Sequence, residues 1–149
     1  MRREFGNFFQ ELLHNFVSGN LEAMRSAFAL PFELHFAGKT LCVGTDGELQ
    51  TMLMRRRERL FENRVSDIRI ELTEIERGVG DRLRCQVVWH YRFRSAVKSR
   101  VAEYFLHMDE GGPRIRMVDV GLRRPPSCWM QDIPALTHYP DVGRRLRQI

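Results

Sequence analysis

The strongest constraint on the fold of this chain is the alternation of apolar and polar side chains between Leu83 and Phe93. Apolar residues occupy every odd position of this stretch, whereas arginine, glutamine and histidine fill most of the even ones. Such alternation is typical of a β-strand that buries one of its faces. Two of the expected inward side chains, Trp89 and Tyr91, carry a polar group on an aromatic ring, so this face could line a ligand cavity or a dry core.

Length and composition indicate one globular domain. The chain has 149 residues, of which 43% are hydrophobic and 29% are charged, and these values fit a soluble globular protein better than a disordered chain. No apolar run approaches the ~18 residues that a transmembrane helix needs. Charges also interrupt the N-terminal segment, unlike a signal peptide. We therefore expect a cytoplasmic protein without membrane contact.

Helical patterns come first along the chain and strand patterns follow. Apolar residues recur with helical spacing at 5–17 and predict a first helix. A second helix is expected to begin after the cap at Asn20 and to end at Pro31. A capping box at Thr45 predicts the start of a third helix, which continues to about Phe61. Short alternating stretches form a hairpin within 32–43, and long strands are expected at 65–77, 83–93, 99–109 and 114–122. This order predicts an α+β fold in which a curved antiparallel sheet, ending in a four-strand meander, wraps around the first helix.

The folded domain is expected to cover residues 1–122. From Arg123 onward the chain is rich in proline and arginine and shows no periodicity. Residues 123–149 are therefore interpreted as an irregular extension that packs on the domain or on a partner.

Residues 17–24, followed by Phe28, Ala29 and the strand at Phe32, resemble the first two helices and first strand of the nuclear transport factor 2-like superfamily. Residues 43–49 resemble the start of its third helix. The resemblance covers about residues 5–122 and implies a cone-shaped fold with a hydrophobic pocket at its open end. Ketosteroid isomerase, scytalone dehydratase, the SnoaL-type cyclases and non-catalytic binding proteins share that fold, so the fold does not fix a function.

The resemblance to ketosteroid isomerase does not extend to its chemistry. The tyrosine of its first helix falls at Leu12, and the aspartate base of its first strand falls at Phe36. Because that mechanism needs a carboxylate to move the proton, this chain is not expected to use it.

Counting across the turns predicts how the last three strands pair. A four-residue loop at 95–98 would set Trp89 opposite Tyr104, and a loop at 110–113 would set Tyr104 opposite Asp119. On the concave face, Asp119 could then act as a general acid or base with Tyr104 as hydrogen-bond donor, and the resemblance to SnoaL-type cyclases implies an aspartate on this strand. A shift of one residue would instead turn Asp119 outward toward the arginines. Both directions stay open.

The concave face is predicted to bind a small apolar or aromatic molecule without catalysis and without a cofactor, because it holds aromatic residues and few acids or bases. The expected ligand contacts are Leu12, Phe16, Phe36, Trp89, Tyr91, Tyr104 and Met117. The alternative is a cyclase, isomerase or hydratase of the SnoaL type that uses Asp119 as acid or base.

The convex face of the sheet is predicted to form a homodimer. Val88, Phe105 and Val118 would make an apolar patch there among charged residues, which is typical of association surfaces. A dimeric structural or interaction domain is therefore a third possible function. The competing interpretation is that the extension, with Trp129 and Ile133, covers this patch.

Other patterns predict no further site. His35, His90 and His107 have no second ligand at metal-binding spacing on the same element, so no metal is expected. The arginines at 55–57 could contact nucleic acid, but Glu58 follows them and no aromatic residues lie between them. We interpret this run as a solvated helix face.

Overall fold

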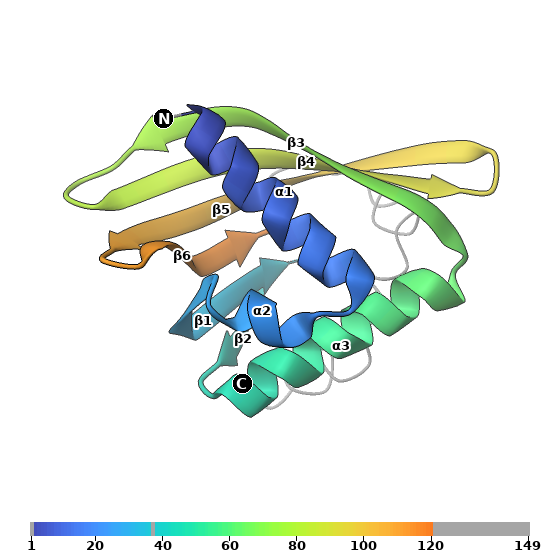
Figure 1. Ribbon diagram of the computed structural model, residues 1–149, viewed down its shortest axis with the longest axis horizontal. Helices are drawn as coiled ribbons and strands as arrows, with labels where there is room; N and C mark the ends of the chain where they lie inside the picture. Colours follow the sequence, from blue (N-terminus) through green and yellow to red (C-terminus); the bar gives the residue numbers. More distant parts are fainter. Residues whose placement is uncertain (1, 37, 121–149) are drawn as a thin grey trace.

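A computed structural model of the chain describes residues 2–36 and 38–120, and the predicted extension at 123–149 lies outside them. A curved six-stranded sheet bends around the helices (Figure 1), which confirms the predicted α+β class. The elements are α1 (Arg2–Ser18), α2 (Leu21–Arg25), β1 (Phe28–Phe36), β2 (Lys39–Val43), α3 (Asp46–Glu62), β3 (Val65–Arg77), β4 (Arg82–Phe93), β5 (Ala96–Asp109) and β6 (Gly112–Asp119). No helix in the described part of the chain is long and apolar enough to span a bilayer.

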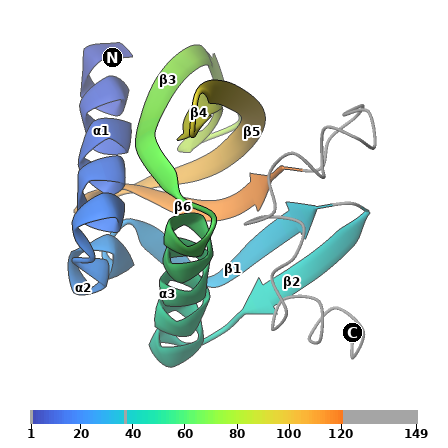
Figure 2. The same ribbon diagram turned by 90° about the vertical axis from the view of Figure 1, so that its right-hand side faces the viewer.

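The strand order in the sheet is β2-β1-β6-β5-β4-β3. Strands β1 and β6 run parallel to each other, and all other neighbours are antiparallel. Figure 2 shows β3, β4 and β5 curling over, with α1 and α3 beside the hollow of the sheet. The consecutive strands β3 to β6 are the predicted meander, and β1 joins them across the parallel pair.

Helix α1 lies against the concave face of the sheet through an apolar stripe. Its buried side chains are Phe5, Phe9, Leu12, Leu13 and Phe16, which follow the helical spacing expected from the sequence. After the helix, Gly19 adopts a φ of 81°, a left-handed conformation that glycine tolerates and that commonly ends helices.

Helix α2 is shorter than predicted. It ends at Arg25, and Phe28, which was expected in this helix, is already the first residue of β1. The reason is tertiary pairing, because Phe28 aligns with Ile115 of β6 and the Ile115 amide donates to the Ala27 carbonyl at 2.7 Å. The strand continues through Pro31, which was expected to mark the helix end.

Helix α3 begins at the predicted cap Thr45, although Glu48 reaches back to the amide of Gly44 and not to that of Thr45 as in a standard capping box. The Thr45 hydroxyl accepts from the Glu48 amide at 3.1 Å, and the Glu48 carboxylate accepts from the Gly44 amide at 3.0 Å. These contacts satisfy amides that have no partner inside the helix. The capped start fixes α3 next to the cone, with Leu49, Leu53 and Leu60 buried.

Strand β4 buries the face that its alternation predicts. Leu83, Cys85, Val87, Trp89 and Tyr91 are all buried, whereas the even-numbered residues of the strand are not. The predicted pairing with β5 is nevertheless displaced, because the turn has two residues: Phe93 aligns with Ala96, and Trp89 therefore aligns with Arg100. This displacement spans an even number of residues, so every side chain keeps its predicted face.

The predicted pairing between β5 and β6 is wrong by two residues next to the turn, where Asp109 aligns with Gly112, and by one residue at its far end. Leu106 aligns with Ile115 but Phe105 aligns with Met117, so Arg116 is an extra residue in a β-bulge. Beyond the bulge, Tyr104 aligns with Val118, and Asp119 lies opposite Glu103. Asp119 therefore lies on the convex face, which decides between the two directions that the sequence left open.

The bulge also changes the convex apolar patch. Val118 is buried on the concave side, so it cannot contribute to a dimer contact as predicted. Met117 takes its place on the convex face beside Phe105, and Val88 lies on the same face of β4. Val88 aligns with Val101, whereas Phe105 aligns with Arg84, so Val88 lies four residues away from the pair of Phe105 and Met117. The predicted homodimer stays a prediction, with Phe105 and Met117 as adjacent apolar residues on this face.

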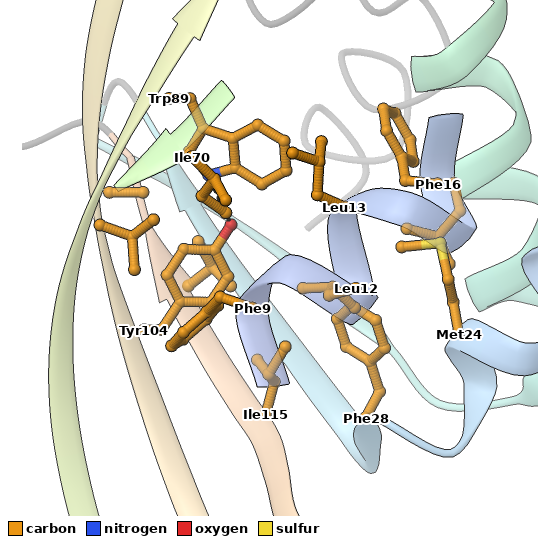
Figure 3. Packing of buried hydrophobic residues seen from close by; sticks show 14 of the residues in the cluster. Phe9, Leu12, Leu13, Phe16, Met24, Phe28, Ile70, Trp89, Tyr104 and Ile115 are labelled. Atoms are coloured by element: carbon orange, nitrogen blue, oxygen red, sulfur yellow. Dashed lines mark hydrogen bonds between the residues drawn. The ribbon is translucent and has the colours of Figure 1, made fainter. Parts of the chain in front are cut away.

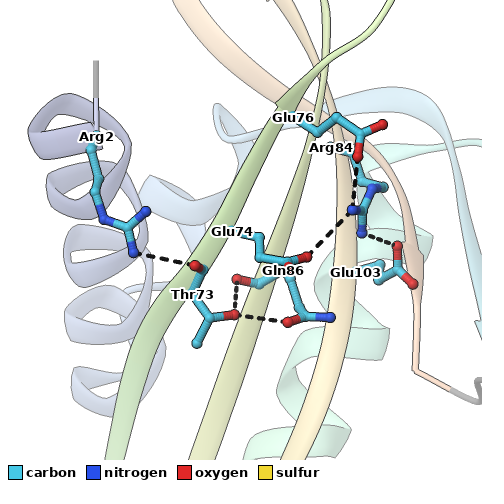
Figure 4. Close-up of polar contacts among 7 residues, drawn as sticks. All are labelled: Arg2, Thr73, Glu74, Glu76, Arg84, Gln86 and Glu103. Atoms are coloured by element: carbon cyan, nitrogen blue, oxygen red, sulfur yellow. Dashed lines mark hydrogen bonds and ion pairs between the residues drawn. The ribbon is translucent and has the colours of Figure 1, made fainter.

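Charged residues link the strands on this convex face. Arg84 on β4 contacts Glu76 on β3 at 3.0 Å and Glu103 on β5 at 2.5 Å (Figure 4). Hydrogen bonds to these two carboxylates raise the pKa of Arg84. Arg2 of α1 donates to the Thr73 carbonyl on β3 at 3.3 Å, which ties the helix to the edge of the sheet.

Candidate ligand-binding site

A cavity lies between the concave sheet and the three helices. Its volume is about 60 Å³, which is enough for roughly four water molecules. Every helix and four strands contribute to its wall, which consists of Leu12, Phe16, Met24, Phe28, Phe32, Leu34, Phe36, Met52, Leu53, Arg56, Trp89, Tyr104, Val118 and Val120. The wall is apolar except at Arg56, Trp89 and Tyr104.

Trp89 and Tyr104 form a polar pair within this wall. The Trp89 indole Nε1–H donates to the Tyr104 hydroxyl at 2.9 Å, and the two polar atoms point toward each other in Figure 3. Both side chains are 4% exposed, and desolvation is the main cause that raises the pKa of Tyr104 to about 12. Tyr104 therefore stays a neutral phenol at physiological pH, and its own O–H proton is a donor.

Arg56 brings a positive charge to the same wall. Its guanidinium carbon lies 5.1 Å from the Trp89 ring centroid and 5.6 Å from that of Phe16, and Nη2 donates to the Tyr91 hydroxyl at 3.1 Å. Arginine stacks well on aromatic faces. These contacts hold the guanidinium at the edge of the cavity.

A second arginine lies deeper on the concave side. Arg100 on β5 is 1% exposed and aligns with Trp89 in the sheet. Desolvation, with a smaller contribution from the charge of Arg56, lowers the pKa of Arg100 to about 10. Two guanidinium groups therefore lie on the side of the sheet that carries Trp89.

The cavity contains most of the predicted ligand contacts. Leu12, Phe16, Phe36, Trp89 and Tyr104 line it as expected from the sequence.

Three other predicted site residues do not line it. Tyr91 is fully buried behind Trp89, with ring centroids 6.2 Å apart, and reaches the site through Arg56. Met117 and Asp119 lie on the convex face because of the bulge. Asp119 therefore does not meet the geometric condition for an acid or base beside Tyr104.

Arg56 was missed because the arginines at 55–57 were interpreted as one solvated face. The sequence does contain a pattern that predicts an inward-facing Arg56. Position 56 lies on the same side of a helix as Leu49, Leu53 and Leu60. Arg57 also has a specific role, since Nε donates to the Phe16 carbonyl and Nη2 to the Val17 carbonyl, each at 2.9 Å. The run is therefore divided between the cavity and the C-terminal end of α1.

The chemistry available in this wall is hydrogen-bond donation and aromatic contact. None of the described residues that line the cavity is an aspartate, glutamate, histidine, cysteine or lysine. Among the described residues there is also no group of three or more metal-binding side chains.

Comparisons with known proteins address the fold. The chain matches no protein-family profile and no curated protein, whereas solved structures match it closely in shape. An NTF-2 like protein of unknown function from Shewanella oneidensis superposes with a TM-score of 0.64 at 11% identity, over 82% of this chain and all of that one. The fold is that of the nuclear transport factor 2-like proteins.

Other structures with the nuclear transport factor 2-like fold agree with this assignment. Aln2 from a Streptomyces species has a TM-score of 0.64 at 13% identity, over 80% of this chain and 89% of that one. A putative scytalone dehydratase from Novosphingobium aromaticivorans has a TM-score of 0.57 at 11% identity, over 80% of this chain and 81% of that one. At such identities the likeness shows the fold alone, and the fold expected from the sequence is confirmed.

Proposed function

We propose that this protein binds a small apolar or aromatic molecule in the cavity and does not transform it. The observation that carries the proposal is the composition of the wall, where apolar side chains surround one buried donor pair, Trp89 and Tyr104. Ligand sites are typically apolar cavities with a few polar groups that orient the ligand. The small volume favours a molecule with one ring.

The alternative, a SnoaL-type reaction at Asp119, lacks support from the geometry. General acid–base catalysis needs a group within hydrogen-bond reach of the substrate, and Asp119 lies on the opposite face of the sheet from Tyr104.

A thermal-shift screen with one-ring molecules tests the proposal. We would use 4-ethyltoluene, 4-ethylphenol, 4-ethylbenzoate and 4-ethylbenzamide. A ligand at a hundred times its Kd stabilises the folded state by about 2.7 kcal/mol, and for a chain of this size Tm rises by roughly 2–4 °C per kcal/mol.

Two matched variants locate the binding site. Val118→Phe adds a ring on the cavity side of the sheet, and Val88→Phe adds the same ring on the convex side. We expect the wild type and Val88→Phe to respond to a ligand, whereas Val118→Phe should not. Absence of any response, or an equal response in Val118→Phe, would contradict the proposal.

A further inference from the structure

The polar part of the cavity wall consists of hydrogen-bond donors. The guanidinium group of Arg56 contains N–H donors and no acceptor atom, and the indole N–H of Trp89 is also a donor. The Tyr104 hydroxyl accepts from Trp89 at 2.9 Å, so the phenol can present its O–H proton to a ligand. A ligand that forms hydrogen bonds with these groups therefore needs acceptor atoms.

The charge of the wall has one sign. Among the described lining residues, Arg56 is the one with a formal charge, and Arg100 adds a second guanidinium on the same side of the sheet, opposite Trp89. Like charges in a low-dielectric interior repel each other strongly. An anionic ligand next to Arg56 would be attracted by its guanidinium, whereas a neutral ligand of the same shape would not.

Arg56 is also preorganised for such an anion. Its guanidinium packs against the Trp89 and Phe16 rings, and Nη2 is hydrogen-bonded to Tyr91 at 3.1 Å. The planar guanidinium matches the geometry of a carboxylate. Charge-assisted hydrogen bonds of this kind are about twice as strong as neutral ones.

We propose that the ligand is an aromatic carboxylic acid, whose ring occupies the apolar part of the cavity and whose carboxylate is bound by Arg56 and the Tyr104 hydroxyl. This inference rests on the proposed function and specifies the ligand class. The apolar side chains around Leu12, Phe28 and Leu34 contact the ring, and the donor side determines its orientation.

Isothermal titration calorimetry near neutral pH with 4-ethylbenzoate and 4-ethylbenzamide tests this inference on the full chain. The two molecules share size and ring and differ in charge. We expect the wild type to bind the acid at least tenfold more tightly than the amide.

Arg56→Gln should abolish this preference by weakening the acid at least tenfold while leaving the amide almost unchanged. Arg55→Gln is the matched control, because it removes an equal charge from the exposed neighbouring position of α3, and it should keep the preference. The comparison of acid and amide in the wild type needs no variant, so it decides the question even if Arg56→Gln fails to fold.

The outcomes separate this inference from the proposed function. Equal affinity of the wild type for acid and amide would overturn the carboxylate assignment and leave the apolar ligand site standing. An unchanged preference in Arg56→Gln would overturn the role of Arg56. If the acid, the amide and 4-ethyltoluene all fail to bind, both proposals are wrong.

Discussion

The hydrogen bond between Trp89 and Tyr104 joins two buried side chains in the wall of the cavity. Both side chains are buried, so neither polar atom can exchange its partner for bulk water. The pair therefore stabilises the fold and also supplies a polar position inside an apolar cavity.

We predict that Tyr104→Phe lowers the free energy of unfolding at neutral pH by about 1–3 kcal/mol, because the Trp89 N–H loses its acceptor. Urea denaturation measures this loss. Tyr91→Phe is the comparison variant, because its hydroxyl is also buried but accepts from the charged Arg56, so its loss should be at least as large. A change below the error of the measurement in Tyr104→Phe would contradict this account.

The same pair predicts a pH dependence. Burial raises the pKa of Tyr104 to about 12 in the folded state, while the unfolded value is about 10. Unfolding therefore releases a proton between these pH values, and rising pH favours the unfolded state. Relative to Tyr104→Phe, the wild type should lose up to about 2–3 kcal/mol over this range. A pH-independent difference between the two proteins would show that Tyr104 is not desolvated.

At the scale of secondary structure, the run at 55–57 joins two helices and a cavity. Arg57 donates to the Phe16 and Val17 carbonyls at the end of α1, where carbonyl groups have no partner inside the helix. Arg56, its neighbour, contacts the cavity. Arg57 therefore connects α3 to α1, and the adjacent Arg56 is the proposed ligand contact.

We predict that Arg57→Gln lowers the free energy of unfolding by about 1–2 kcal/mol, since it removes charge-assisted hydrogen bonds to the end of α1. Arg55→Gln, at an exposed position of the same helix, should cost less than about 0.5 kcal/mol. Chemical denaturation of both variants distinguishes them. Equal losses would mean that the α1 contact contributes nothing specific.

The elements also show what the sequence could predict. Alternation in β4 predicts the inner face correctly, because an even displacement of the strand pairing leaves faces unchanged. The direction of Asp119 stays open in the sequence, because apolar Val118 and Val120 favour an outward aspartate whereas counting from the turn favours an inward one. The bulge at Arg116 decides between the two directions. Arg56 was missed for a related reason, since one charged residue in an apolar stripe is easily assigned to solvent.

At the scale of the whole molecule, the fold is compatible with many functions, and the residues of the cavity wall reduce the number of functions to consider. Proteins with this cone-shaped architecture host unrelated functions. The apolar wall, the Trp89–Tyr104 pair and the arginines are properties of this chain. They favour binding of an acidic aromatic molecule over acid–base catalysis.

The homodimer is the second prediction at this scale. If the convex face associates through the adjacent residues Phe105 and Met117, sedimentation velocity across the micromolar range should show a dimer that Met117→Lys converts to a monomer. Val118→Lys is not a suitable test, because Val118 is buried in the cone. A wild-type monomer at every concentration would contradict the dimer and leave the cavity proposal unaffected.

The most direct test of the central claim is the Trp89 indole N–H signal in a ¹H–¹⁵N spectrum during titration with 4-ethylbenzoate, assigned by its loss in Trp89→Phe. This proton lies in the cavity wall and is hydrogen-bonded to Tyr104. We predict a saturable shift of the signal in the wild type and none in Val118→Phe. A signal that stays in place while calorimetry detects binding would show that the ligand binds elsewhere and would contradict this account.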